Sequence, residues 1–362
     1  MIDNTGLMLD LWRTGKLRIA SPPALAAPSG ERPPMDRVRG ALVGLAVGDS
    51  LGNTSEAMAP AARAAAHGEI RDYLPNRFAA GRRVGLPSDD TQLAVWLLDS
   101  MLDRGGFDAR DAAKRFAARR IFGIGGTMRG FLAAYKSGRD LWDCGQPSAG
   151  NGALMRVASV PLYHANAGTA AIGADAVLSS ALTHNDPTST ASCAAFAAMI
   201  GDLLRMTSPP EPEWWVRRFV GVARPIEGPA RLRSRLPGSS FEGSLCDFVE
   251  SEVLSAHRRG LPIRDALEGW YSGAYLLETV PSVLCVLMAH GHDPEQAILR
   301  AVNDTWDNDT AAAIVGAAVG ALHGEAALPR RWRDALLGRT TDDDDGHLFQ
   351  ALERMEWQLI GK

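Results

Sequence analysis

Carboxylates gather at two places in the sequence where an apolar helix is expected to begin. At one of them, Asp307, Asp309 and Thr310 precede a run without charge that reads AAAIVGAAVGALHG. Carboxylate and hydroxyl oxygens are the ligands that Mg²⁺, Mn²⁺ and Ca²⁺ prefer, and a bound cation would offset the cost of burying acidic groups beside an apolar helix. Either aspartate could instead cap the helix, so this stretch alone leaves metal binding and capping both open.

The second acidic group is Ser88-Asp89-Asp90-Thr91, which leads into the helical pattern QLAVWLLDSML. Ser88 is expected to cap this helix, but a cap does not account for two adjacent aspartates. Ser88, Asp89 and Asp90 offer three hard oxygen ligands at a helix start. Together with residues 307–310 they could enclose two divalent cations. Few histidines and no cysteines lie beside these carboxylates, which argues against zinc.

A weaker acidic candidate ends an earlier helical pattern. The sequence GDSLG at 48–52 is followed by Glu56, and a turn here could expose carboxylates to a cation. Glycine capping of the helix C-terminus explains the glycines equally well.

Two glycine-rich stretches lie between the acidic groups, GIGGT at 123–127 and PSAGNGALMR at 147–156. Backbone N–H groups in such turns suit phosphate or diphosphate oxygens, although turns of this kind are also common in large helical proteins. Asn151 could hydrogen-bond a ligand directly. His184, in the sequence THND, lies near a helix boundary where the residues after it could simply be caps.

Helical patterns account for most of the chain. Beyond the one that starts at Met35, they cover 90–104, 109–122, 174–183, 189–206, 245–258, 274–291 and 293–303. Alternating patterns typical of strands are nearly absent. Small residues recur at four-residue spacing on the helices near both ends of the chain, which would let those helices pack together. We therefore predict an all-α fold, a single orthogonal helical bundle.

Two stretches stand apart from this pattern. Residues 1–35 hold an apolar peptide and a Pro-rich linker, so we expect an arm that docks on the domain formed by residues 36–362 or serves a partner. Residues 207–241 are rich in proline and arginine and are expected to form a loop-rich excursion around one short helix. Its arginines fit a solvated surface or an acidic partner. The four aspartates at 342–345 are expected in a solvated loop.

The composition limits the classes of partner. The chain has 362 residues, 46% of them hydrophobic, and a formal net charge of −4, so it has no basic field for nucleic acid or a membrane surface. Its apolar runs are too short to span a membrane. Asp3 and Asp10 argue against a secretion signal. The cysteines are far apart without CxxC spacing, so we expect reduced thiols in a cytoplasmic protein.

The order and spacing of these groups resemble the ADP-ribosylglycohydrolases, the family of the dinitrogenase-reductase-activating glycohydrolase and the ADP-ribosylhydrolases. The resemblance spans about 37–324 and rests on GLAVGDSLGNTSE, SDDTQLAVWLLDS, GNGALMRVASVPL, THNDP and the stretch from ETVPSVLCVLMAHGHDPEQ to NDTWDNDTAAAIVGAAVGALHG. It implies an all-α bundle that hydrolyses the bond between ribose C1″ and a modified side chain, most often arginine.

The resemblance also implies a role for individual residues. Two Mg²⁺ ions, or Mn²⁺, would be held by Ser88, Asp89, Asp90, Asp307, Asp309 and Thr310. The catalytic acid or base would be one of Glu56, Asp89 and Asp90. ADP-ribose would be held by Gly123, Gly125, Gly126, Thr127, Ser148, Gly150, Asn151, Gly152 and His184.

This chain departs from the family pattern near the acidic group at 307–310. The usual Gly-Gly-Asp-Thr-Asp-Thr run is TWDNDT at 305–310, so Trp306 replaces a small residue and could narrow the pocket or stack on substrate. Ser88 stands where threonine is more usual. These changes bear on substrate identity more than on catalysis.

We therefore expect a hydrolase that removes ADP-ribose from arginine of an ADP-ribosylated protein. One alternative keeps the fold and metals but acts on O-linked ADP-ribose, as in serine, a polymer or O-acetyl-ADP-ribose. Another is an immunity protein that neutralises an ADP-ribosyltransferase toxin through the arm at 1–35.

Overall fold

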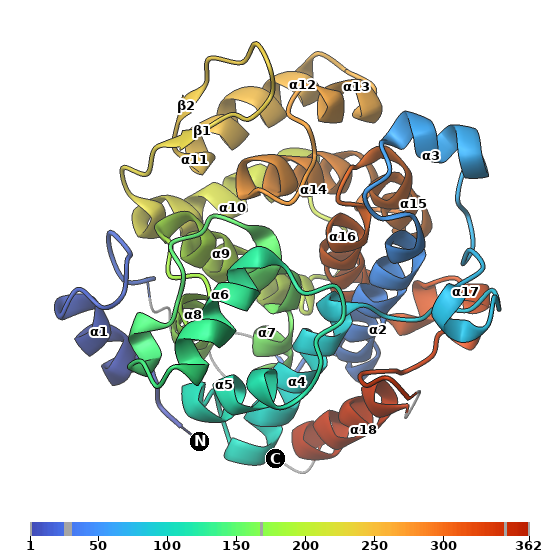
Figure 1. The fold of residues 1–362 in the computed structure, drawn as a ribbon. Coiled ribbons are helices and arrows are strands. Elements are labelled where there is room, and N and C mark those ends of the chain that lie inside the picture. The colour runs from blue at the N-terminus through green and yellow to red at the C-terminus, as the bar shows by residue number, and fades with distance from the viewer. Residues whose placement is uncertain (1, 25–30, 167–168, 344–345, 361–362) are drawn as a thin grey trace.

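Helices make up most of the chain (Figure 1), and the predicted all-α fold is confirmed. The computed structural model describes residues 2–24, 31–166, 169–343 and 346–360. Within those residues the named strands are β1 (Leu232–Arg233) and β2 (Glu242–Gly243), which form one short antiparallel pair.

The elements follow one another along the chain in this order. The earlier α-helices are α1 (Thr5–Arg13), α2 (Met35–Gly52), α3 (Pro60–His67), α4 (Asp89–Arg104), α5 (Ala109–Ala118), α6 (Gly126–Lys136), α7 (Ser159–Tyr163), α8 (Thr169–Ala181) and α9 (Pro187–Leu203). The later ones are α10 (Pro212–Glu227), α11 (Leu245–Phe248), α12 (Leu254–Arg258), α13 (Ile263–Glu268), α14 (Leu276–His290), α15 (Pro294–Asp304), α16 (Asn308–His323), α17 (Arg330–Asp334) and α18 (His347–Ile360). Short 3₁₀ helices are η1 (Asn53–Ser55), η2 (Arg77–Ala79), η3 (Leu141–Asp143), η4 (Asn151–Arg156) and η6 (Glu325–Ala327), and η5 (Val249–Val253) is a π-helical turn.

The predicted helices are present, with different ends. The helix expected at 109–122 ends at Ala118, and the one expected at 245–258 is divided by η5. Within 207–241, α10 is longer than the short helix we expected. Pro212 occupies its first turn, where the missing N–H of proline costs no helical hydrogen bond.

Helices α2 and α16 lie side by side at the centre of the fold (Figure 1), and glycines set their separation. A Cβ atom on Gly44 would lie 2.2 Å from the carbonyl oxygen of Gly316, and one on Gly48 would lie 2.0 Å from that of Ala312. No side chain fits at such distances, so the two backbones are in direct contact. The predicted packing of the small-residue helices near both ends of the chain is confirmed.

The other helices surround this pair. Helix α9 packs between α8 and α10, α15 packs on α16, and α4 packs against both α2 and α16. The end of α2 therefore meets the beginnings of α4 and α16, so the predicted acidic groups come together at one end of the central pair.

The N-terminal arm docks on the rest of the chain. Met8 in α1 is fully buried, and the side chain of Asn4 donates a hydrogen bond of 2.6 Å to Asp175. The backbone N–H of Arg18 donates to the side-chain oxygen of Asn185 (3.0 Å), which follows His184. Part of the Pro-rich linker lies outside the described residues. Of the two roles expected for the arm, the structure shows docking.

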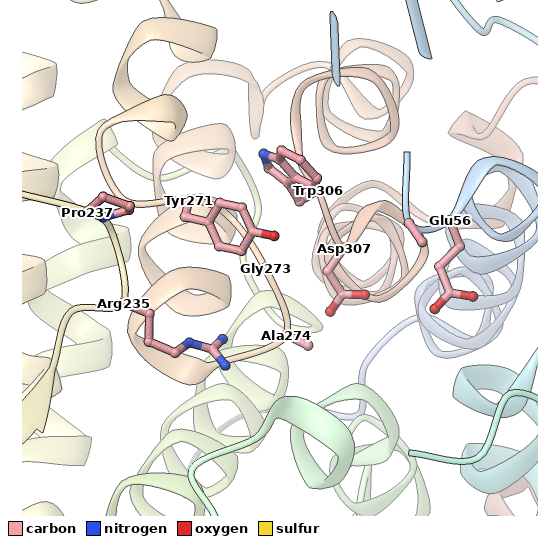
Figure 2. Close-up of a pocket in the computed structure, with 9 residues that line it drawn as sticks. Glu56, Arg235, Pro237, Tyr271, Gly273, Ala274, Trp306 and Asp307 are labelled. Carbon is pink, nitrogen blue, oxygen red and sulfur yellow. The ribbon is translucent and has the colours of Figure 1, made fainter. Parts of the chain in front are cut away.

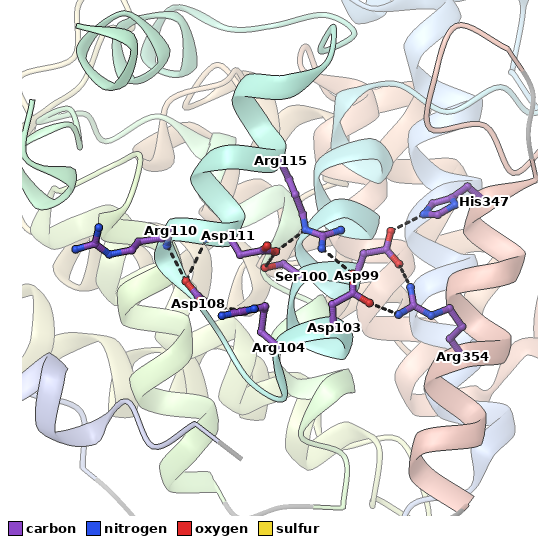
Figure 3. A network of polar contacts seen from close by, with 10 residues as sticks. All are labelled: Asp99, Ser100, Asp103, Arg104, Asp108, Arg110, Asp111, Arg115, His347 and Arg354. Carbon is purple, nitrogen blue, oxygen red and sulfur yellow. Dashed lines mark hydrogen bonds and ion pairs between the residues drawn. The ribbon is translucent and has the colours of Figure 1, made fainter. Parts of the chain in front are cut away.

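The C-terminal helix α18 is attached to α4 by charged groups (Figure 3). Arg354 donates to Asp99 at 2.9 Å and also pairs with Asp103, while His347 pairs with Asp99. Asp99 is 3% exposed and lies well away from the acidic groups described below. This cluster therefore holds the end of the chain in place.

Three other features bear on the sequence predictions. The four cysteines are all free and buried. In the part of the chain that the structure describes, no helix combines the length and hydropathy that crossing a membrane requires. Two aspartates of the acidic run at 342–345 lie outside the described residues.

Candidate active site

The central helix pair brings the acidic groups together. A Cβ atom on Gly52, the last residue of α2, would lie 2.5 Å from the Cα of Asp309 in the first turn of α16. Between α2 and α16, Asn308 donates hydrogen bonds to the oxygen of Gly52 (3.1 Å) and to the hydroxyl of Ser55 (3.0 Å). These contacts fix the loop that carries Glu56 against the start of α16.

Asp49 organises the acidic group at 88–91, a role that the sequence did not predict. Its side chain, fully buried in α2, accepts hydrogen bonds from the backbone N–H groups of Ser88 (2.9 Å) and Thr91 (3.1 Å). It also accepts from the Ser88 hydroxyl (2.7 Å) and the Thr91 hydroxyl (2.5 Å). Asp49 thus satisfies N–H groups at the start of α4 that have no partner within the helix.

The prediction that Ser88 caps α4 is wrong, because its hydroxyl donates to Asp49 and makes no capping hydrogen bond. The Ser88 oxygen therefore keeps its lone pairs for another partner. The sequence did place Asp49 in a candidate acidic turn, but nothing local to that turn indicates which distant helix it caps.

The carboxylates converge on one point. Glu56, Asp307 and Asp309 each have a carboxylate oxygen within 4.8 Å of the other two. Asp90 is 2% exposed, and its Oδ1 has no hydrogen-bond partner among the described residues. Asp307 stands at the N-cap position of α16 without making a capping hydrogen bond, and Asn151 donates to it instead (2.5 Å). Of the alternatives left open by the sequence, capping is therefore not what Asp307 does.

Burial and mutual repulsion disfavour negative charge on these groups. Burial, followed by the charge of Asp49, raises the pKa of Asp89 from 3.8 to about 8. Burial and neighbouring carboxylates also raise the pKa values of Asp90 and Asp309 well above the usual range. The pKa of Glu56 is raised by burial and by the charge of Asp307. Crowded oxygens of this kind fit a hard cation, which would replace the protons and neutralise the charge.

We expect the metal-free protein to lose stability as the pH rises from about 5 to 8. The pKa of Asp89 is about 8 in the fold against 3.8 in a model peptide, so in this window the folded state binds more protons than the unfolded state. Stability conferred by a raised pKa is present at low pH and is lost as pH approaches the folded value. Thermal unfolding in excess chelator across this pH range measures the effect.

Two controls accompany that measurement. Added Mg²⁺ should flatten the pH dependence because the cation takes the place of the protons. Asp89→Asn should reduce the slope because the substituted side chain does not titrate. A metal-free protein whose midpoint of thermal unfolding rises steadily over the same pH range would contradict the prediction.

The first glycine loop lies directly beside the acidic groups. Gly123 has a φ of +60°, which favours glycine, and a Cβ there would meet Asp89 Oδ1 at 2.6 Å. Gly125 precedes the first residue of α6, Gly126, and neither has any heavy atom within 4 Å of the place where its Cβ would lie. Gly125, Gly126 and Thr127 line the cavity described below, as an anion site at a helix start requires.

Buried polar groups support the second glycine loop. Arg156, 1% exposed, donates to the oxygen of Gly152 (2.7 Å) and to the hydroxyl of Thr183 (2.6 Å). The Ser148 hydroxyl lies 2.8 Å from that of Thr127 and so joins this loop to the first. The two loops form one wall.

His184 packs against the second loop. A Cβ on Gly152 would lie 3.1 Å from its ring, and its Nδ1 lies 2.8 Å from the Thr183 hydroxyl. Burial, and then the positive charge of Arg156, lower the pKa of His184 from 6.5 to about 3. With so low a pKa, the ring is neutral at physiological pH. Asp186 caps α9 by accepting from two backbone N–H groups, so capping accounts for that residue of THND.

These walls enclose a cavity of about 280 Å³. Most of the residues predicted from the sequence line it, namely Glu56, Asp89, Asp90, Gly123, Gly125, Gly126, Thr127, Gly150, Asn151, Gly152, His184, Asp307, Asp309 and Thr310. The predicted residues that do not line it are Ser88, Ser148 and Trp306. Ser88 and Ser148 hydrogen-bond to residues around it, whereas Trp306 lines a second cavity (Figure 2).

Arg63 supports the acidic cluster and has no signal in the sequence. Its guanidinium is fully buried and donates to the carbonyl oxygens of Met58 (2.9 Å), Val302 (2.9 Å) and Thr305 (2.7 Å). It thus joins the loop after Glu56 to the turn before Trp306. The sequence around Arg63 is an ordinary alanine-rich helix, so this role depends on contacts with residues distant in sequence.

The comparisons with known proteins agree with this geometry. The family model described as ADP-ribosylglycohydrolase matches residues 31–358. An ADP-ribosylarginine hydrolase from Serratia proteamaculans is 29% identical over 345 residues, which cover 88% of this chain and 79% of the relative. The ADP-ribosyl-[dinitrogen reductase] glycohydrolase from Rhodospirillum rubrum is 28% identical over 306 residues, which cover 83% of this chain and 90% of that relative.

A solved structure shares the architecture. The protein named as an ADP-ribosylglycohydrolase-related protein complex aligns with a TM-score of 0.63 and 26% sequence identity, over 89% of this chain and 98% of that one. The matched family model extends over nearly the whole chain and includes both acidic groups and both glycine loops. The chain belongs to the ADP-ribosylglycohydrolase family.

Proposed function

We propose that the protein hydrolyses the N-glycosidic bond between ribose C1″ and the guanidinium nitrogen of an ADP-ribosylated arginine in a protein. The acidic cluster at one end of a cavity walled by two glycine loops carries this proposal. N–H groups in the loops suit a diphosphate, and the carboxylates suit the reacting ribose. The relatives named as ADP-ribosylarginine hydrolases support arginine as the linkage.

The cluster fits a pair of hard divalent cations, which we propose are Mg²⁺, with Mn²⁺ as a possible substitute. The side chains that would hold them are Ser88, Asp89, Asp90, Asp307, Asp309 and Thr310. Two observations support this set: Oδ1 of buried Asp90 has no hydrogen-bond partner among the described residues, and the Ser88 hydroxyl directs its proton to Asp49. Bound cations would supply Lewis-acid chemistry, orienting the vicinal ribose hydroxyls and acidifying water.

The residues of the chain itself would perform three tasks in the reaction. The glycine loops and Asn151 would hold the ADP-ribose, so that C1″ lies beside the carboxylates. Negative charge there would stabilise the positive charge that develops on the ribose in the transition state. A water molecule would attack C1″ as the C1″–N bond breaks and give up a proton to a carboxylate, for which we propose Glu56, Asp89 or Asp90. The carboxylate would then pass this proton to the guanidine nitrogen that leaves.

The proposed function is tested by comparing substrates with different linkages. We expect ADP-ribose to be released from an arginine-modified protein, to stop on addition of excess chelator, and to resume when Mg²⁺ or Mn²⁺ is restored. A serine-modified protein assayed in parallel should react much more slowly. Chromatographic measurement of free ADP-ribose provides the readout.

Each outcome bears on a different part of the proposal. Full activity in excess chelator would contradict the metal dependence. Release from the serine-modified protein alone would favour the O-linked alternative, in which serine, a polymer or O-acetyl-ADP-ribose is the substrate. Neutralisation of an ADP-ribosyltransferase toxin by the arm stays a prediction.

A further inference from the structure

A second cavity adjoins the first on the far side of the acidic cluster. Its volume is about 590 Å³, and it shares Glu56, Ala274 and Asp307 with the inner cavity. The glycine loops line only the inner cavity. Under the proposed function, the bond to be broken would lie where the two cavities meet, and the outer cavity would extend away from the ADP-ribose.

Two aromatic rings form the wall of this outer cavity nearest the carboxylates (Figure 2). The ring centroids of Tyr271 and Trp306 lie 4.8 Å apart, and the ring planes are tilted by 40°. Tyr271 is 37% exposed, although large aromatic side chains are usually covered. A tilted, accessible aromatic pair beside two carboxylates is suited to a flat organic cation.

The backbone holds this pair in place. Tyr271 has a φ of +70°, a conformation that is costly for any residue except glycine. The carbonyl oxygen of Ser272 accepts from the N–H groups of Trp306 (3.2 Å) and Asp307 (3.1 Å), so the two aromatic segments are tied together. A strained residue held by neighbouring hydrogen bonds is typical of binding sites, where its orientation is set before the ligand arrives.

The arginine in the outer cavity is already neutralised. Arg235, from the excursion at 207–241, makes two hydrogen bonds to Glu278 (2.8 and 2.7 Å), whose side chain is 3% exposed. The guanidinium of Arg235 also lies over the ring of Tyr275. Arg235 forms part of the cavity wall opposite Trp306. Because its charge is paired with a buried carboxylate, it does not make the cavity an anion site.

We propose that the outer cavity is the subsite for the leaving group, where Tyr271 and Trp306 contact the guanidinium of the modified arginine. This inference rests on the proposed function and names residues that give it arginine specificity. It also gives a role to Trp306, which replaces a small residue of the family pattern. A stacked adenine is the competing occupant, but the cavity opens beside Glu56 and Asp307, at the ribose end of the substrate.

The test compares Trp306→Ala and Trp306→Phe on an arginine-modified protein. Loss of the aromatic face should lower kcat/KM about tenfold, mainly by raising KM, whereas phenylalanine should retain most of the activity. Binding of free ADP-ribose, measured by calorimetry, should be unchanged in both variants. That binding also shows that each variant is folded. Trp357→Ala is the matched control, because this tryptophan is 80% exposed on α18, and it should behave as wild type.

Other outcomes would overturn the inference. If Trp306→Ala weakens the binding of free ADP-ribose in parallel with the loss of kcat/KM, the outer cavity holds the adenosine end of ADP-ribose. If Trp306→Ala cleaves the arginine-linked substrate as wild type does, the aromatic pair does not recognise the guanidinium. Failure of the wild-type protein to release ADP-ribose from arginine would instead contradict the proposed function itself.

Discussion

Asp309→Asn is expected to lower the rate of ADP-ribose release about 10³-fold, which corresponds to a loss of about 4 kcal/mol of transition-state stabilisation. Asp309 is 4% exposed in the first turn of α16, and its carboxylate faces those of Glu56 and Asp307. Asparagine keeps the size of the side chain but removes one charge from the set proposed to hold the cations. Rates measured at saturating Mg²⁺ test the effect.

In the absence of metal, the same variant should be more stable than the wild type. Burial and repulsion disfavour the charged form of Asp309, so the metal-free variant should unfold at a higher temperature than the metal-free wild type. Added Mg²⁺ should raise the midpoint of unfolding less in the variant. Asp304→Asn is the matched control, because Asp304 lies in the same stretch but pairs with Arg300, and it should retain activity. An active Asp309→Asn would refute the ligand role.

Gly48→Ala is expected to destabilise the fold by about 3 kcal/mol or more, because the added methyl group has no space. Its Cβ would lie 2.0 Å from the carbonyl oxygen of Ala312, and backbone on both sides prevents relaxation by rotation of a side chain. To accept the methyl group, α2 and α16 must separate, which also moves the acidic residues at their ends. Chemical denaturation, followed by circular dichroism, measures the loss.

A glycine in another helix provides the control for this substitution. Gly221 lies within α10, and among the described residues no heavy atom other than those of its chain neighbours and the backbone of its own helix lies within 4 Å of the position of its Cβ. Gly221→Ala should therefore stabilise the protein by up to about 1 kcal/mol, because alanine favours the helix. Equal effects of the two substitutions would mean that the contact between α2 and α16 does not limit stability.

The all-α fold and most residues of the candidate site could be predicted from the sequence, because each functional group lies in a short local motif. Ser88, Asp89 and Asp90 are consecutive, and Asp307 and Asp309 begin a helix of obvious periodicity. The resemblance to a known family then related these motifs to one another across the chain. The roles of the individual residues, and the boundaries at 1–35 and 36–362, stay predictions.

The parts that the sequence did not predict depend on contacts between distant segments. Asp49 takes over the capping that was assigned to Ser88, although the two residues are on different helices. Arg63 binds carbonyl oxygens that belong to a turn far along the chain. Tyr271 lines the outer cavity with a positive φ, a conformation that its residue type does not predict. In each case the decisive partner is specified by the packing.

The pairing of α2 with α16 also has a consequence for the order of events in biosynthesis. Helix α2 begins at Met35, near the start of the chain, whereas α16 begins at Asn308. A nascent chain that has not yet reached α16 contains both glycine loops but lacks Asp307 and Asp309. Glu56, Asp89 and Asp90 are already present at that stage, but the acidic cluster is incomplete until α16 emerges from the ribosome and packs on α2. The acidic cluster can therefore be completed only after α16 has been synthesised.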